Sequence, residues 1–261
     1  MYYLSIATII KNEDQYLKEW IETHLLFGVE HFYLYDNDNT IPLKISLKEY
    51  IDKGIVDVID FPGPAKQMPA FNHCLQNYGN LSKWICFSDV DEFLLPKKHD
   101  NLQAILKDYE QFACLSVNWL VFGSSGHIEK PPGLVIENYT KCGVRNWYEN
   151  THCKSIVQPH LTLRAGSNPH HFIYKNGYHA VSENKEIVQN AWAPNSTNII
   201  QLNHYFTKSL SEFKEKIARG RSDTDIKEYV RKIDQFYEFE GYCTDENKDI
   251  FKWIDKVKLS V

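Results

Sequence analysis

Strands and helices alternate along the first third of this chain, and this alternation constrains the fold more than any other feature. Apolar runs at 3–10, 31–35 and 55–61 are typical of buried strands, and helical spacing of apolar residues at 14–27 and 46–53 separates them. Adjacent parallel strands require a crossover of this kind. The pattern therefore predicts an α/β fold with a mostly parallel central sheet and helices on both of its faces.

The alternation weakens after about residue 115, where short strands and turn-rich segments follow. Helical spacing returns from Ser209 and again over 224–236. The chain contains no internal repeat, low-complexity tract or obvious linker. We therefore predict one domain over 1–261.

An apolar run at 84–87 ends in three carboxylates, those of Asp89, Asp91 and Glu92. Burying an unpaired carboxylate is costly, so such a cluster is expected at the exposed end of a strand, facing a cation. Asp89 and Asp91 are two residues apart and would point to the same side of an extended segment. This Asp-x-Asp pair predicts a Mn²⁺ or Mg²⁺ site that bridges a nucleotide diphosphate. The alternative is a solvated turn in which a carboxylate caps the next helix.

A histidine and three basic residues near the C-terminus have two interpretations each. His204 follows a short apolar run and is either an ordinary core or surface residue or a metal ligand beside the carboxylates. Lys208, Arg219 and Arg221 follow it. They form either a solvated helix face or a group that holds a departing diphosphate.

Histidines and aromatic residues alternate in the middle of the chain, between residues 119 and 192. They lack HExxH spacing and an accompanying cysteine pair, so a zinc site is not expected. Most aromatic residues belong to a core, whereas exposed ones also stack on sugar rings. The sequence leaves both readings open for this segment.

Composition and missing motifs exclude several functional classes. The net charge of −5 argues against a general nucleic-acid binder, and the longest apolar runs are too short to span a bilayer. The N-terminus resembles a first strand rather than a signal peptide, and the six cysteines are scattered, which predicts a reduced, cytoplasmic protein. P-loop, GxGxxG and GxSxG motifs are absent, which argues against P-loop phosphoryl transfer, dinucleotide redox chemistry and α/β-hydrolase chemistry.

Taken together, ordered blocks over nearly the whole chain resemble glycosyltransferase family 92 and the related bacterial family-2-like glycosyltransferases. These blocks cover residues 9–13, 19–24, 28–37, 84–95, 122–127, 154–157 and 203–220. The resemblance implies a GT-A fold with a single Rossmann-like sheet. It further implies a nucleotide-sugar-binding half at 1–115 and a smaller acceptor-binding half with the C-terminal helices at 116–261.

The resemblance also implies roles for individual residues. Asp89 and Asp91 match the Asp-x-Asp metal motif, and His204 matches the histidine that completes metal coordination in many GT-A enzymes. The implied donor-binding residues are Lys11, Asp36, Asp89, Lys154, Lys208 and Arg219. The carboxylate that accepts the acceptor's proton is Asp223, Glu129 or Glu149, with no ranking among them.

The implied activity is metal-dependent hexosyl transfer, with inversion, from a UDP-sugar such as UDP-galactose to a glycan or lipid-linked glycan. We expect assembly of a bacterial surface polysaccharide or lipopolysaccharide. The expected location is the cytoplasm or the inner face of the membrane, where Lys214, Lys216, Arg219 and Arg221 either touch anionic lipid or form a solvated helix face. The alternatives are an inactive carbohydrate-binding protein, a sugar nucleotidyltransferase of similar fold and a metal-dependent phosphoesterase. A nucleotidyltransferase is expected to carry a Gly-rich loop after its first strand, which residues 11–13 lack.

Overall fold

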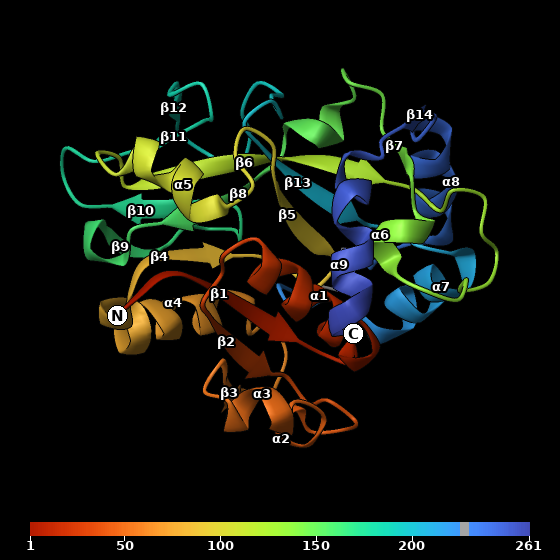
Figure 1. Ribbon diagram of the computed structural model, residues 1–261, viewed down its shortest axis with the longest axis horizontal. Helices are drawn as coiled ribbons and strands as arrows, with labels where there is room; N and C mark the ends of the chain where they lie inside the picture. The colour runs from red at the N-terminus through yellow and green to blue at the C-terminus, as the bar shows by residue number, and fades with distance from the viewer. Residues whose placement is uncertain (225–229) are drawn as a thin grey trace.

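A large sheet with the order β12-β11-β6-β8-β4-β1-β2-β3 forms the centre of the computed structural model, which describes residues 1–224 and 230–261 (Figure 1). β13 joins this sheet through β6 and pairs with β5, and β7 joins β6 to β14. The strands are β1 (Tyr2–Ile10), β2 (His31–Asp36), β3 (Val56–Asp60), β4 (Ser82–Phe87), β5 (Glu92–Pro96), β6 (Cys114–Phe122), β7 (Lys141–Cys142), β8 (Cys153–Val157), β9 (Thr162–Ala165), β10 (Phe172–Tyr174), β11 (Ala180–Val181), β12 (Ile187–Val188), β13 (Ile200–Tyr205) and β14 (Asp245–Glu246). The α-helices are α1 (Asp14–Leu26), α2 (Leu43–Ser46), α3 (Lys48–Asp52), α4 (Gln67–Tyr78), α5 (Leu102–Leu106), α6 (Val135–Asn138), α7 (Leu210–Arg219), α8 (Ile233–Tyr242) and α9 (Ile254–Ser260).

The sheet is parallel in its N-terminal half, which confirms the predicted α/β class. β1 pairs in parallel with β2 and β4, and β2 pairs in parallel with β3. Beyond β4 the sheet is mixed, because β8 runs antiparallel to both β4 and β6. The helix expected at 46–53 is two short helices, α2 and α3, which lie beside β3 in Figure 1.

Alternate residues of β1 pack against helices on opposite faces of the sheet. Leu4, Ile6 and Ile10 belong to the core cluster that contains α1, whereas Ala7 and Ile9 belong to the cluster that contains α4. All five side chains are buried, as expected for a strand covered on both faces. The helices of the parallel half therefore lie on both sides of the sheet, as predicted.

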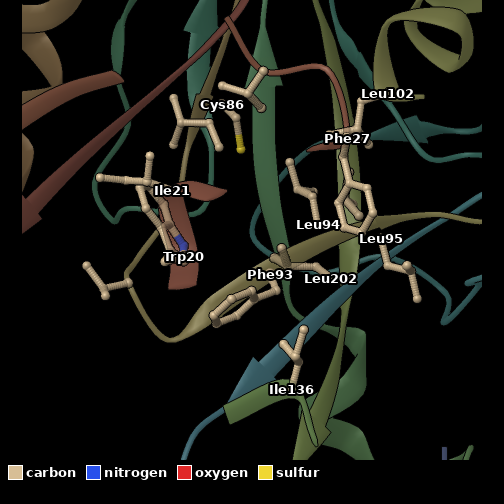
Figure 2. Close-up of a cluster of buried hydrophobic side chains, with 14 of the residues drawn as sticks. Trp20, Ile21, Phe27, Cys86, Phe93, Leu94, Leu95, Leu102, Ile136 and Leu202 are labelled. Carbon is tan, nitrogen blue, oxygen red and sulfur yellow. The ribbon is translucent and has the colours of Figure 1, made fainter. Parts of the chain in front are cut away.

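The core on the α1 face fixes the start of β5. Figure 2 shows Trp20 of α1 beside Phe93 of β5. The fully buried indole of Trp20 donates a hydrogen bond of 2.8 Å to the backbone carbonyl of Glu92. Full burial of a large apolar side chain stabilises the fold by about 2 kcal/mol. The chain between β4 and β5 is thereby held at both ends.

The Asp-x-Asp pair lies in that connection, within a tight turn rather than in an extended segment. The backbone N–H of Glu92 donates to the carbonyl of Asp89 across the turn. The prediction that Asp89 and Asp91 point to one side of an extended strand is therefore wrong, since a turn rotates successive side chains in different directions. The two carboxylates bind different partners.

The C-terminal segments complete the sheet next to this turn. β13 lies between β5 and β6, with His204 opposite Glu92 and the backbone N–H of Tyr205 bonded to the carbonyl of Asp91 at 2.8 Å. α7 begins at a capping box in which the Ser209 hydroxyl and Glu212 bond each other's backbone N–H groups, as the helical signal from Ser209 predicted. Of the helix expected over 224–236, α8 supplies only the part from Ile233, and 225–229 lie outside the described residues.

The sheet continues across the expected boundary between residues 115 and 116, because β4 and β5 pair with β8 and β13. The division of the chain into donor and acceptor halves stays a prediction. None of the helices within 1–224 and 230–261 has both the length and the apolarity needed to cross a membrane.

Candidate active site

A cavity lies at the carboxyl end of β1, beside the turn between β4 and β5. β13 and the end of α7, which belong to the C-terminal part of the chain, supply residues that also line this cavity. The carboxyl ends of strands are where open α/β sheets bind ligands. The sequence-predicted residues that line this cavity are Lys11, Asp89, Asp91, Glu149, His204, Arg219 and Asp223.

Asp91 forms a buried ion pair at the base of the cavity. Its Oδ2 atom lies 2.6 Å from the ammonium of Lys216 and 3.6 Å from Nε2 of His204. Lys216 also donates to the backbone carbonyl of Phe206 at 2.8 Å. Burial alone would raise the pKa of Asp91, but the charge of Lys216 and the His204 imidazole hold that pKa well below its usual range. Burial lowers the pKa of Lys216 to about 8, so both partners are charged at neutral pH.

Asp89 has a separate set of partners on the other side of the turn. Its carboxylate accepts hydrogen bonds from the Gln67 amide at 2.8 Å and from the Lys154 ammonium at 2.6 Å. Lys154 lies 3.4 Å from Glu92, which also accepts from the Ser88 hydroxyl and the Asp89 backbone N–H. Burial raises the pKa of Glu92 to about 8, against the effect of the Lys154 charge, which lowers it. Each aspartate of the turn thus has its own lysine.

The donor atoms of Asp91 and His204 fit a divalent cation. A carboxylate oxygen and an imidazole nitrogen are ligands that Mn²⁺ accepts, and Nδ1 of His204 is buried with no hydrogen-bond partner within the described part of the chain. Asp89 is instead engaged by Lys154 and Gln67. Within 1–224 and 230–261, no three His, Cys, Asp or Glu side chains group as a metal cluster. The ligand set of Asp89, Asp91 and His204 stays a prediction, of which Asp91 and His204 are already side by side.

Arginines from the end of α7 and the following segment line the cavity. Arg219 donates to Glu13 at 2.9 Å, and Arg221 binds both oxygens of Asp223 at 2.8 and 2.6 Å. Arg231 lines the same cavity. Guanidinium groups at this end provide the planar, two-pronged donors that suit phosphate oxygens.

The family model of glycosyltransferase family 92 matches residues 1–236, and this match decides the assignment. The chain belongs to glycosyltransferase family 92. Membership agrees with the GT-A type of α/β fold that the sequence predicted.

Relatives in this family come from plants and animals. A glycosyltransferase family 92 protein of Ricinus communis is 31% identical over 222 residues, which cover 83% of this chain and 37% of the relative. A protein named beta-1,4-galactosyltransferase of Caenorhabditis elegans is 22% identical over 80% of this chain and 48% of its own length. Among solved structures, S. aureus TarS (residues 1–349, in complex with UDP) has a TM-score of 0.42 and 13% identity, covering 61% of this chain and 47% of that one. This family 92 chain thus spans well under half the length of its first curated relative.

The three candidate bases lie in different surroundings. Asp223 is held by Arg221, and although burial acts in the opposite direction, that contact lowers its pKa. Glu149 lines the cavity 3.4 Å from the His152 ring, and burial raises its pKa. Glu129 is exposed on a loop and does not line the cavity. A carboxylate with a raised pKa accepts a proton more readily than one held by a guanidinium, which favours Glu149 over Asp223.

Other predicted donor-binding residues lie outside the cavity. Asp36 accepts hydrogen bonds from Asn39 and from the backbone of Leu43, so it organises the loop after β2. Lys154 is buried beneath Asp89, which it orients. Lys208 is 5% exposed and lines a neighbouring cavity, with its ammonium over the Tyr16 ring.

Sequence reasoning missed the role of Lys216, which it considered only for contact with lipid or for a solvated helix face. Its side chain is buried against Asp91, Arg219 and Arg221 line the cavity, and Lys214 is exposed and does not line it. Gln67, which bonds Asp89, was also missed, because nothing local distinguishes it from an ordinary first residue of a helix. The aromatic and histidine-rich middle segment was the signal for Trp119, His152 and His170, which all line the cavity.

Proposed function

We propose that this chain transfers a hexose, with galactose as the first candidate, from a UDP-sugar to a hydroxyl of a glycan. Family membership supports sugar transfer, and the relative named as a beta-1,4-galactosyltransferase supports galactose. The observation that carries the proposal is the cavity itself, because it combines arginines suited to a diphosphate with a carboxylate, Glu149, that contacts an imidazole rather than an arginine.

The donor's diphosphate would lie against the basic end of the cavity. Lys11 follows β1, Arg219 is the last residue of α7 and Arg221 follows that helix, so cations from both ends of the chain converge there. Lys216 would add a positive charge at the base of the cavity, next to Asp91. Fixed cations in a largely closed site stabilise the charge that develops on a departing diphosphate.

A Mn²⁺ or Mg²⁺ ion would be held by Asp91 and His204, with Asp89 as the third predicted ligand. Bound there, the ion would neutralise negative charge on the diphosphate as a Lewis acid. The Lys216 ammonium now contacts the same Asp91 oxygen, so ion binding requires it to leave that atom. Lys154 and Gln67 keep Asp89 oriented toward the cavity.

Glu149 is the proposed base of an inverting reaction. The acceptor hydroxyl oxygen forms a bond to the anomeric carbon of the donor sugar. The bond from that carbon to the diphosphate oxygen breaks, and its electron pair leaves with UDP. The hydroxyl proton passes to the Glu149 carboxylate, so the products are a glycoside, UDP and a protonated glutamate that later releases its proton.

The test is donor-dependent release of UDP. UDP-galactose, UDP-glucose and UDP-N-acetylglucosamine are each incubated with the chain and Mn²⁺, with and without simple galactosides as acceptors. Thermal stabilisation by UDP is measured in parallel, because a ligand that binds only the folded state raises the melting temperature. Release of UDP that increases with acceptor supports the proposal.

Other products would favour other functions. Glycan binding with no UDP release would indicate an inactive carbohydrate-binding protein. Pyrophosphate release from UTP and a sugar 1-phosphate would indicate a nucleotidyltransferase, and inorganic phosphate would indicate a phosphoesterase. The lipid-linked acceptor, bacterial surface-glycan assembly and location at the membrane stay predictions.

A further inference from the structure

A row of aromatic rings runs from the base of the cavity to the surface. The His204 ring lies 4.2 Å from Trp119, measured between ring centroids, and Trp119 stacks on His152 at 5.0 Å. The Trp192 ring lies 5.5 Å from His152, at the outer end. The Tyr148 ring, one turn before His152, lies 5.7 Å from the His152 ring. The row connects the Asp91 ion pair to solvent.

Backbone pairing holds the row rigid. The N–H of Trp119 donates to the carbonyl of His152 at 2.9 Å, and His152 pairs with Trp192 in an antiparallel bridge. Hydrogen bonds from Cys153 to the Ala191 carbonyl and from Ala193 to the Thr151 carbonyl flank that bridge. Side chains that face each other across such pairs project from the same face of a sheet, so these rings form one continuous surface.

The outer rings of the row are exposed although their inner neighbours are not. His204 is 5% exposed, whereas Trp192 is 41% exposed and Tyr148 is 60% exposed. A rigid aromatic surface next to a cavity indicates a ligand site more strongly than isolated exposed apolar residues do, because a bound ligand can pack against the whole surface. Nothing within the described residues covers these two rings.

The charges of the cavity indicate which ligand suits this end. The cationic residues that line it come from positions 11 and 216–231, at the diphosphate end. The lining residues between 119 and 204 include Glu149 and three histidines, and within the described chain no lysine or arginine. A phosphate group would therefore have no lysine or arginine partner at this end of the cavity. An uncharged sugar ring has partners there, because its C–H face packs on aromatic rings and its hydroxyls bond carboxylates and imidazoles.

We propose that Trp192 and Tyr148, which both contact the His152 ring, form an acceptor subsite in which uncharged pyranose rings of the acceptor glycan stack on these aromatic side chains. This subsite rests on the proposed transferase function. The Glu149 carboxylate is 3.4 Å from the same His152 ring. A sugar seated there places a hydroxyl next to the proposed base.

The test uses the methyl β-glycosides of galactose, glucose and N-acetylglucosamine as probes, with binding followed by saturation-transfer NMR. We expect at least one glycoside to bind the unsubstituted chain, and Trp192→Ala and Tyr148→Ala each to weaken that binding roughly three- to tenfold. Trp192→Phe is expected to retain most of it. Tyr178→Ala is the matched control, because Tyr178 is 46% exposed and, among the described residues, has no ring contact with the aromatic row.

UDP binding by each variant is measured in the same samples, which separates this subsite from the donor site. Equal glycoside binding by Trp192→Ala and the unsubstituted chain would overturn the subsite, as would the absence of binding for all three glycosides. Loss of both ligands in Trp192→Ala would indicate misfolding, and Tyr148→Ala then decides. Weaker glycoside binding with UDP binding retained supports the subsite, and glycoside binding equal to that of Tyr178→Ala overturns it. A chain that binds glycosides but releases no UDP would refute the transferase and leave the sugar site intact.

Discussion

The Asp91 carboxylate and the Lys216 ammonium are 2.6 Å apart, although 125 positions separate them in the sequence. Both side chains are 7% exposed, so both charges are buried. Each compensates the other, and either charge would be costly in this environment without its partner. Removing one partner of such a pair is destabilising, and replacing both by neutral groups is much less so. Comparing a single variant with a double variant therefore tests the structural role of Asp91 separately from its proposed catalytic role.

Asp91→Asn should lower turnover by at least about 100-fold, because the charge that organises the diphosphate site is lost. The single variant should also lose about 3 kcal/mol of unfolding free energy, since Lys216 remains buried and unpaired. The double variant Asp91→Asn/Lys216→Met should recover most of that stability and remain inactive. Urea unfolding and UDP release measure the two effects. Turnover in the stable double variant would remove Asp91 from the mechanism.

Lys216 should compete with a divalent ion for Asp91, because its ammonium already pairs with that carboxylate. We expect Lys216→Met to bind Mn²⁺ more tightly than the unsubstituted chain. Titration followed by the electron paramagnetic resonance of free Mn²⁺ measures this without relying on activity. If neither protein binds Mn²⁺, the predicted metal site is wrong. Removal of metal by EDTA should then leave transfer unchanged.

Glu149→Gln should reduce turnover by about 100-fold or more, because the acceptor proton loses its base. In the unsubstituted chain, activity should fall as the pH drops through the pKa of Glu149, which burial raises above the usual glutamate range. Glu149→Gln should lack this acidic decline. Asp223→Asn is the comparison, with a smaller expected loss, because Arg221 already holds Asp223. The opposite order in the two pH profiles would identify Asp223 as the base.

Lys154→Met should destabilise the fold by about 3 kcal/mol, because it leaves Asp89 and the buried Glu92 without their shared cation. Lys252→Met is the matched control. Lys252 pairs with Asp100 at 3.1 Å, but both side chains are more than half exposed, so the expected change is below about 1 kcal/mol. Equal unfolding free energies for the two variants would show that Lys154 contributes no more than a surface lysine.

His24 should make the protein sensitive to acid. Its Nδ1–H donates to the Trp20 carbonyl, and its Nε2 accepts from the backbone N–H of Leu94, so the folded chain requires neutral imidazole. Burial lowers its pKa from 6.5 to about 4. The unfolded chain therefore binds more protons below pH 6.5, and stability falls by about 3 kcal/mol as the pH drops from 6.5 to 4.

Urea unfolding of His24→Gln across that pH range measures this contribution. The variant should be less stable at neutral pH and show a shallower loss on acidification. His99→Gln, at an exposed position, is the control and should keep the full slope. An identical slope for His24→Gln and the unsubstituted chain would exclude His24 as the source.

The residues that sequence reasoning located correctly are those with a local signal. Strand–helix alternation gave β1, α1 and β2, and the apolar run at 84–87 placed Asp89 and Asp91 at the end of β4. Gly28, which follows the C-cap of α1, adopts a left-handed conformation with φ near +93°. The extended geometry of the Asp-x-Asp pair was wrong, because the turn depends on where β5 pairs with β13.

The sequence by itself determined the α/β class, the parallel half of the sheet and the position of the acidic turn, because periodicity and turn chemistry act over a few residues. Only the tertiary structure decided which cation each aspartate binds, that Glu149 and Asp223 but not Glu129 line the cavity, and how Trp119, His152 and Trp192 align. Those relationships depend on the register between β13, β8 and strands far away in the chain. That register is set by the packing of the whole core rather than by any one segment.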